Sequence, residues 1–186
     1  MSYQSVIKDT ESKFEKALAH LQQQLRAIRT GRASSALVDN LKVDYYGTPT
    51  PISQMASVSV PEPRQLIIKP FDPSIIKELN KALLKSDLGV APQDDGKVVR
   101  LNLPALSGEQ RNKYAAKVKE ICEETRVAMR NGRRDLNKQA DAMLKSSEIT
   151  EDENKKLHSE IQDSLKKYEG KVDEVYKKKV EEIQGD

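Results

Sequence analysis

The sequence predicts an α+β protein, in which an antiparallel three-helix bundle carries a small inserted β/α/β domain. Two observations lead to this prediction. Three segments of the 186-residue chain repeat apolar residues at steps of four and three, which is the spacing of bundle helices. Between the first and second of these segments the pattern changes to the alternation of strands, and all eight prolines lie in that stretch.

The first helical segment covers residues 4–30. A lone helix with one apolar stripe is not stable in water, so this segment must pack on others. Gly31 follows it and suits the left-handed conformation that often ends a helix. The apolar stripe consists of Ile7, Phe14, Leu18, Leu21, Leu25 and Ile28.

The inserted segment alternates apolar and polar residues in short runs that are separated by turn residues. Pro61 and Pro63 should end the second run, because proline cannot donate to a sheet. Asp72-Pro73-Ser74 should begin the helix. The expected elements are strands at 41–46, 56–60, 66–68 and 98–103, a turn at 47–51, and a helix from 72 that closes at 87–89.

The second helical segment, residues 107–147, is the longest element and should extend roughly 60 Å. Ser107 begins it, and Cys122 falls toward its apolar stripe. The stripe consists of Tyr114, Val118, Ile121, Thr125, Ala128, Gly132, Leu136, Ala140 and Met143.

The third helical segment begins after Thr150, which forms a capping box with Glu153. Its stripe runs through Leu157, Ile161, Leu165, Tyr168, Val172, Val175 and Ile183. We therefore expect a discontinuous bundle domain of residues 1–30 and 106–186, with residues 31–105 as the inserted domain. The two connections should act as a hinge at Thr30, Gly31, Arg32, Leu103, Pro104 and Ala105.

Charge is distributed unevenly between the helices. Residues 106–147 carry 10 basic and 6 acidic side chains, whereas residues 148–186 carry 8 and 12. Within the cationic helix, Arg126, Arg130 and Arg133 project together, about a quarter turn from the apolar stripe. Arginine suits bidentate contacts with phosphate, so this row predicts binding to RNA. Charge spacing alone leaves an equal alternative, a solvated face that pairs with Glu123 or with the acidic third helix.

Further arginines extend this hypothesis. Arg130, Arg133 and Arg134 have only Asp135 among them as a nearby acid in the sequence. Arg29 and Arg32 flank the first connection and have a simpler alternative role, which is to bridge the two domains. The complete set of candidate RNA-binding residues is Arg126, Arg130, Arg133, Arg134, Arg29 and Arg111.

No pattern of an active site occurs. The chain has no Gly-rich phosphate loop, so we expect no nucleotide hydrolysis and no cofactor. His20 and His158 lie on different helices without further ligands, which predicts no metal site. Cys122 is the single cysteine, so no internal disulfide can form and a packed thiol is expected. No segment reads as a membrane span, and we expect a cytoplasmic monomer.

Four segments, taken together, resemble the ribosome recycling factor family: residues 28–33, 43–49, 86–89 and 126–135. The resemblance covers the whole chain. It implies an L-shaped protein that is similar in outline to tRNA and binds the RNA of the large ribosomal subunit after termination. Elongation factor G would then split the complex with GTP, which that partner and not this chain would use.

The resemblance also implies roles for single residues. Arg130 and Arg133 match the family's RNA-contacting positions, and Arg126 and Arg29 match further basic positions of the bundle. Gly132 departs from the family, which usually has a β-branched residue there. A glycine inside a helix costs about 1 kcal/mol relative to alanine, so it either permits close helix packing or loosens the helix. A different class of function, a helical adaptor or chaperone-like module that binds an acidic protein, stays the alternative.

Overall fold

The computed structural model describes residues 2–185 and contains two compact units, which we treat separately. The helical unit consists of the residues up to Leu25 together with Ala115–Glu181. The small-domain unit consists of Arg26–Tyr114 and the residues from Glu182 onward. The hinge positions expected from the sequence, at residues 30–32 and 103–106, concern motion and stay a prediction.

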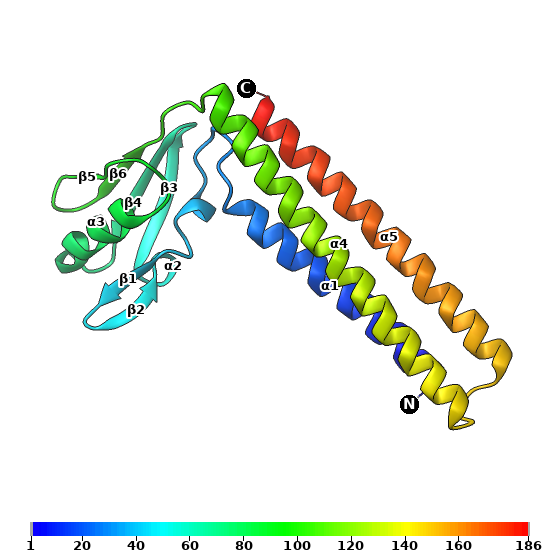
Figure 1. Ribbon diagram of the computed structural model, residues 1–186. Helices are drawn as coiled ribbons and strands as arrows, with labels where there is room; N and C mark the ends of the chain where they lie inside the picture. Colours follow the sequence, from blue (N-terminus) through cyan, green and yellow to red (C-terminus); the bar gives the residue numbers. More distant parts are fainter. Residues whose placement is uncertain (1, 186) are drawn as a thin grey trace. The chain divides into compact units, whose positions relative to one another are not determined.

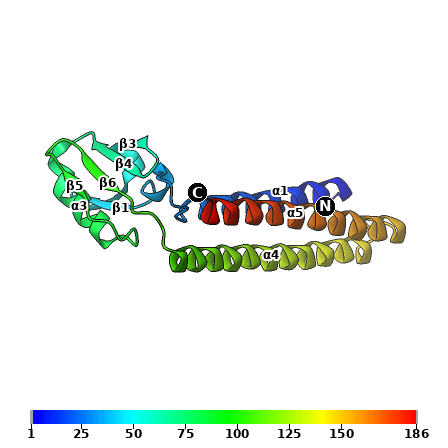
Figure 2. The same cartoon turned by 90° about the horizontal axis from the view of Figure 1, so that it is seen from above.

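Three long helices form the helical unit and continue a short way into the other unit: α1 (Tyr3–Arg26), α4 (Gly108–Lys145) and α5 (Glu151–Gln184). In the helical unit, α4 runs antiparallel to both α1 and α5 (Figures 1 and 2). The interior is formed by the expected leucine, isoleucine and aromatic side chains. Phe14 of α1 and Tyr168 of α5 meet there, with ring centroids 5.7 Å apart. The predicted α+β fold with a three-helix bundle is confirmed.

Reciprocal hydrogen bonds begin both later helices. The Thr150 N–H donates to the Glu153 carboxylate at 2.8 Å, and the Glu153 N–H donates to Thr150 Oγ1 at 3.3 Å. This is the predicted capping box. Ser107 and Gln110 make the same pair of bonds at the start of α4.

The end of α1 differs from the prediction. The helix ends at Arg26, four residues before Thr30. Ile28 and Arg29 are both buried, and Arg29 donates to the carbonyls of Leu88 and Pro104. These tertiary contacts outweigh the local helical pattern. Gly31 does adopt a left-handed conformation, with φ +88°, but it does so within a loop and not as the helix cap.

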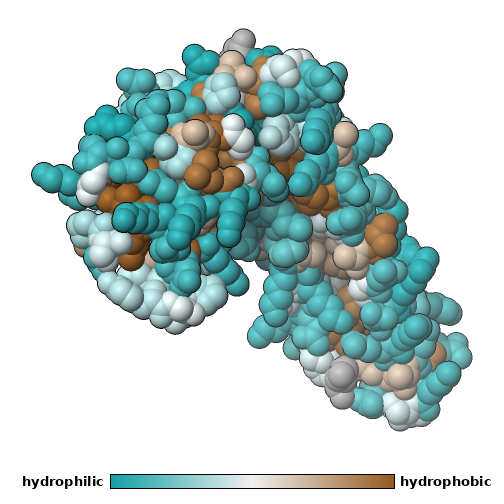
Figure 3. Space-filling view, turned by 60° about the vertical axis from the view of Figure 1, so that its left-hand side comes forward, coloured by the Kyte–Doolittle hydropathy of each residue, from teal (hydrophilic) through white to brown (hydrophobic). Residues whose placement is uncertain are grey.

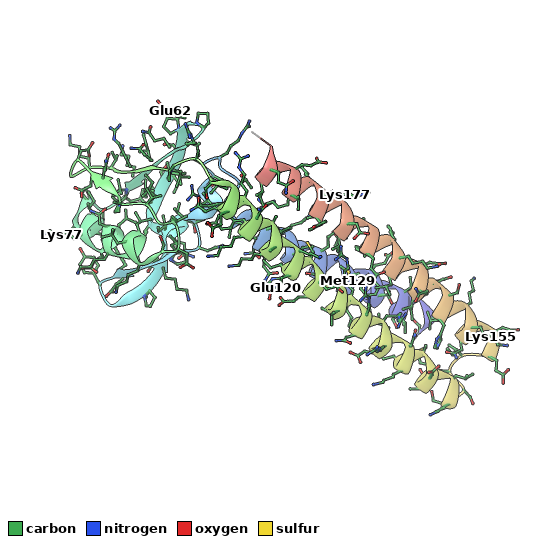
Figure 4. The ribbon with its side chains drawn as sticks, turned by 45° about the horizontal axis from the view of Figure 1, so that its top comes forward. Glu62, Lys77, Glu120, Met129, Lys155 and Lys177 are labelled. Atoms are coloured by element: carbon green, nitrogen blue, oxygen red, sulfur yellow. The ribbon has the colours of Figure 1, made fainter. Side chains whose placement is uncertain are left out.

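The apolar face of α4 is confirmed in most positions and wrong at Ala128, which is exposed. Met129 takes the core position beside it and is 1% exposed. Figure 4 labels Met129 together with Glu120, an exposed residue of the same helix. Ala128 leaves the apolar face because steps of three and four residues drift against the 3.6-residue turn over a long helix.

Gly132 is not required by packing. A Cβ built at this position would meet Phe14 Cε1 at 3.6 Å, which is an ordinary van der Waals contact. We therefore expect Gly132→Ala to stabilise the chain by about 1 kcal/mol through helix propensity. Urea unfolding followed by circular dichroism would measure this. A loss of stability would show that close helix approach needs the glycine.

The small-domain unit contains a four-stranded antiparallel sheet in the order β3-β4-β6-β5 and a separate β1-β2 hairpin. Its strands are β1 (Lys42–Tyr45), β2 (Thr48–Pro51), β3 (Ala56–Glu62), β4 (Gln65–Pro70), β5 (Gln93–Asp94) and β6 (Val99–Asn102). Its helices are α2 (Ile52–Met55) and α3 (Ile76–Lys85), with single 3-10 turns at Ser35–Leu37 and Pro73–Ile75.

The strands at 41–46, 56–60, 66–68 and 98–103 are confirmed with small shifts at their ends. The expected turn at 47–51 is wrong, because residues 48–51 form β2 and pair with β1. Pro49 and Pro51 are tolerated because β2 has only one neighbouring strand. Pro61 does not end β3 either, since a bulge between Ser59 and Glu62 accommodates it.

One apolar core holds the small-domain unit together. Val43, Leu66, Ile68, Leu79 and Leu101 are completely buried in it. Asp72 begins the helical region as expected, because its carboxylate accepts the Ser74 N–H at 2.9 Å. On the face shown in Figure 3, hydrophilic side chains surround small apolar patches.

Candidate nucleic-acid interface

The arginine row of α4 faces side chains of α5. Arg126 donates to Glu123 on its own helix at 3.0 Å and to Asp173 on α5, and its side chain is 18% exposed. Burial alone would lower the pKa of Arg126, but the hydrogen bonds to Asp173 and Glu123 outweigh burial and raise it. Its charge is therefore balanced within the protein.

Arg130 occupies the next position of the row and is more exposed. Its Nε donates to Glu169 at 3.0 Å, and one terminal nitrogen lies 3.4 Å from Glu123. The side chain remains 46% exposed. The expectation that Arg130 has only Asp135 as a nearby acid is wrong, because Glu123 of α4 and Glu169 of α5, 39 residues away in the sequence, both pair with it.

Arg133 has a different partner. One of its terminal nitrogens donates to the amide oxygen of Gln162 at 2.9 Å, so its nearest partner carries no charge. Its Nε is buried without a hydrogen-bond partner among residues 2–185. Arg134 is exposed, and the described part of the chain gives its side chain no partner. Positive charge is thus least balanced at this end of the row.

The two interpretations of the arginine row, RNA binding and internal ion pairing, therefore apply to different residues. Arg126 and Arg130 make the pairs with Glu123 and α5 that the alternative reading proposed. Arg133 and Arg134 carry charge without a carboxylate partner in the described chain. The α5 residues Gln162, Glu169 and Asp173 were missed, and the only indication of them in the sequence was the acidic balance of the last helix.

The two remaining candidates belong to the small-domain unit, whereas the row belongs to the helical unit. Arg29 is 6% exposed, and it donates to the carbonyl oxygens of Leu88 at 3.3 Å and Pro104 at 2.8 Å. Arg111 is half-buried and donates to the Gln184 carbonyl at 3.2 Å. Arg29 therefore joins the first connection of the chain to the second.

Backbone hydrogen bonds hold both connections at the β3–β4 turn. The Ala33 N–H donates to the Pro63 carbonyl at 2.6 Å, and the Leu103 N–H donates to the Arg64 carbonyl at 2.7 Å. The expected hinge segments thus lie beside the same turn, within the small-domain unit.

The structure also shows the surroundings of Cys122 and His158. Cys122 is completely buried, and burial raises the pKa of its thiol, so it packs as an apolar residue. His158 Nε2 lies 2.8 Å from Asp141 Oδ1. Among the described residues, no three His, Cys, Asp or Glu side chains group as metal ligands, and no helix is long and apolar enough to cross a membrane.

Comparison with known proteins decides the family. The sequence model of the ribosome recycling factor family matches residues 21–183. The ribosome-recycling factor of Alkaliphilus metalliredigens is 49% identical over 178 residues, which is 96% of each chain. That of Nitratidesulfovibrio vulgaris is 44% identical over 183 residues, 98% of each chain.

This chain belongs to the ribosome recycling factor family. A solution structure of a ribosome recycling factor matches with a TM-score of 0.77 and 32% identity, and the match covers 100% of this chain and 99% of that one. The T. thermophilus ribosome recycling factor has a TM-score of 0.67 and 37% identity, with complete coverage of both chains. That factor is represented together with E. coli elongation factor G on the E. coli post-termination complex. The resemblance recognised in the four sequence segments is confirmed.

Proposed function

We propose that this chain recycles ribosomes after termination, by binding the large subunit and splitting the post-termination complex together with elongation factor G and GTP. Family membership over residues 21–183 carries this proposal. The chain acts in the cytoplasm as a non-enzymatic monomer, and the partner hydrolyses the GTP. The adaptor alternative has no comparable support.

Within this function, the part of α4 around Arg133 and Arg134 contacts ribosomal RNA first. Their charges have no carboxylate partner among the described residues, so they can approach phosphate without breaking an internal ion pair. Arg130, with 46% of its side chain exposed, joins them by exchanging Glu169 for phosphate. Arg126 positions α4 on α5 and contacts RNA least.

A sedimentation experiment tests the proposal. Post-termination ribosomes are mixed with the purified chain, elongation factor G and GTP, and the separated subunits are measured on sucrose gradients. Subunits should appear only when all three components are present. The proposal would be contradicted if ribosomes stayed intact with all three components present while a known ribosome recycling factor split them in the same assay.

The carboxylates of α5 should weaken RNA binding, because they pair with guanidinium groups that would otherwise be available to phosphate. We expect the double variant Glu169→Gln/Asp173→Asn to bind ribosomes up to about fivefold more tightly. This corresponds to the roughly 0.2–1 kcal/mol of an exposed ion pair. Filter binding at fixed salt measures the change.

The matched control for this variant is Glu174→Gln, which removes an exposed charge beside Asp173. In the described chain, Glu174 has no ion-pair partner. An equal rise in the control would indicate only a change in net charge. A fall in affinity for the double variant would show that the carboxylates orient the arginines for RNA.

A further inference from the structure

The side of α4 that faces α5 carries a line of polar side chains, each one helical turn from the next. Arg133 donates to Gln162 of α5 at 2.9 Å, and Asp141 Oδ1 lies 2.8 Å from Nε2 of His158, also on α5. Asn137 comes four residues after Arg133 and four before Asp141, so it lies on the same side of α4. Asn137 therefore faces α5 between these two contacts.

Two polar atoms in this line are buried and have no hydrogen-bond partner among residues 2–185. They are Arg133 Nε, which carries a hydrogen, and Asn137 Oδ1, which can accept one. Folded proteins satisfy nearly all of their buried polar atoms, either within the chain or through ordered water. Side chains four residues apart on a helix are neighbours, with Cβ atoms about 5–6 Å apart. The unpaired donor and the unpaired acceptor thus lie within reach of one bridging molecule.

Water has the chemistry that this place requires. It can accept the Nε–H of Arg133 and donate to Oδ1 of Asn137, which pairs both buried atoms. Gln162 uses its amide oxygen for Arg133, so its amide N–H group can supply a third hydrogen bond, and about three bonds are typical of buried water. We propose that an ordered water joins Arg133 to Asn137, and that Asn137 is a positioning residue for the Arg133 guanidinium.

The partners of Arg133 differ in charge from those of the other two arginines in the row. Arg126 and Arg130 pair with carboxylates of α5, which orient the guanidinium groups and also balance their charge. Gln162 and Asn137 are neutral, so they orient Arg133 and leave its charge available to phosphate. The water and Gln162 use the Nε–H and one terminal N–H, and the other terminal N–H groups remain for a bidentate contact. The inference rests on the proposed function and adds a residue that acts on RNA binding without touching RNA.

A double-mutant cycle tests whether Asn137 acts through Arg133. Asn137→Leu replaces the amide by an apolar group of similar size and should weaken ribosome binding about threefold to tenfold, as expected within one hydrogen-bond network. In the Arg133→Ala background the same change should have no further effect, whereas a general structural loss would persist there. Ribosome pelleting at fixed salt gives the four affinities.

The matched control for this cycle is Asn112→Leu. Asn112 is exposed near the start of α4, so the chemical change is the same but removes no buried acceptor. This variant should bind ribosomes as the unaltered chain does.

Nuclear magnetic resonance on the full-length chain tests the water itself. The Nε–Hε resonance of Arg133 should exchange slowly with solvent and show a cross-relaxation peak to a long-lived water. Asn137→Leu should remove that peak. The Nε–Hε group of Arg134, whose side chain is exposed, should exchange fast in both chains.

The outcomes separate the positioning role from the proposed function. Equal weakening by Asn137→Leu with and without Arg133, or no weakening at all, would overturn the positioning role and leave the proposed function intact. Absence of the water peak at Arg133 would overturn the bridge. Failure of the unaltered chain to bind ribosomes would count against the proposed function, whereas the resonance of Arg133 would still decide the water bridge.

Discussion

Arg133→Ala should weaken ribosome binding by about tenfold or more while the helices and the melting temperature stay nearly unchanged. A charge-assisted hydrogen bond to phosphate contributes about 1.5–3 kcal/mol. Among residues 2–185, the side chain makes one hydrogen bond, to Gln162, whose half-buried amide can bond to water instead. The melting temperature should therefore fall by no more than about 4 °C. Ribosome pelleting and thermal unfolding followed by circular dichroism measure the two effects.

Two comparisons sharpen this prediction. Arg133→Lys keeps the charge but removes the planar fork, so it should recover only part of the affinity if the contact is bidentate. Lys138→Ala removes an exposed positive charge one to two turns further along α4 and should change affinity little. If Arg133→Ala unfolds the chain and ribosome binding by the folded fraction persists, the arginine is structural.

Arg29→Ala should destabilise the small-domain unit by about 3–5 kcal/mol. The side chain is 6% exposed and donates to the carbonyls of Leu88 and Pro104. Each bond from a charged donor contributes about 1.5–3 kcal/mol, and truncation leaves both carbonyls without this partner. Urea unfolding, monitored through hydrogen exchange of the small-domain amides, measures the loss of stability.

This experiment also distinguishes the two roles that sequence allows for Arg29. Ribosome affinity measured well below the unfolding transition should be unchanged if the residue only joins the two connections. A stable variant with weakened binding would instead place Arg29 among the RNA contacts. Arg26→Ala is the matched control, because Arg26 is exposed at the end of α1 and should cost less than about 0.5 kcal/mol.

Much of the fold could be read from the sequence, because the decisive patterns are local. The spacing of Phe14, Leu18 and Leu21 requires a helix with one buried face, and the spacing in α5 requires the same. Thr150 and Glu153 form their cap within one helical turn, so no distant residue is needed to predict it. The four segments that resemble the family are likewise continuous pieces of chain.

The errors arose where distant residues compete with local pattern. α1 ends at Arg26 because the buried Arg29 gains more from its hydrogen bonds to Leu88 and Pro104 than from continuing the helix. Residues 48–51 pair with β1 although two of them are prolines, because this strand needs hydrogen bonds on one side only. Neither outcome can be derived from neighbouring residues.

The sequence by itself determined the α+β class, the three bundle helices and the arginine row, since each depends on spacing within one segment. Only the tertiary structure decided which arginines have balanced charges. Asp173 and Glu169 lie on another helix, and only packing of α5 on α4 brings their carboxylates to Arg126 and Arg130, whereas Gln162 meets Arg133. Electrostatic interaction depends on distance in space, and distance along the chain does not report it.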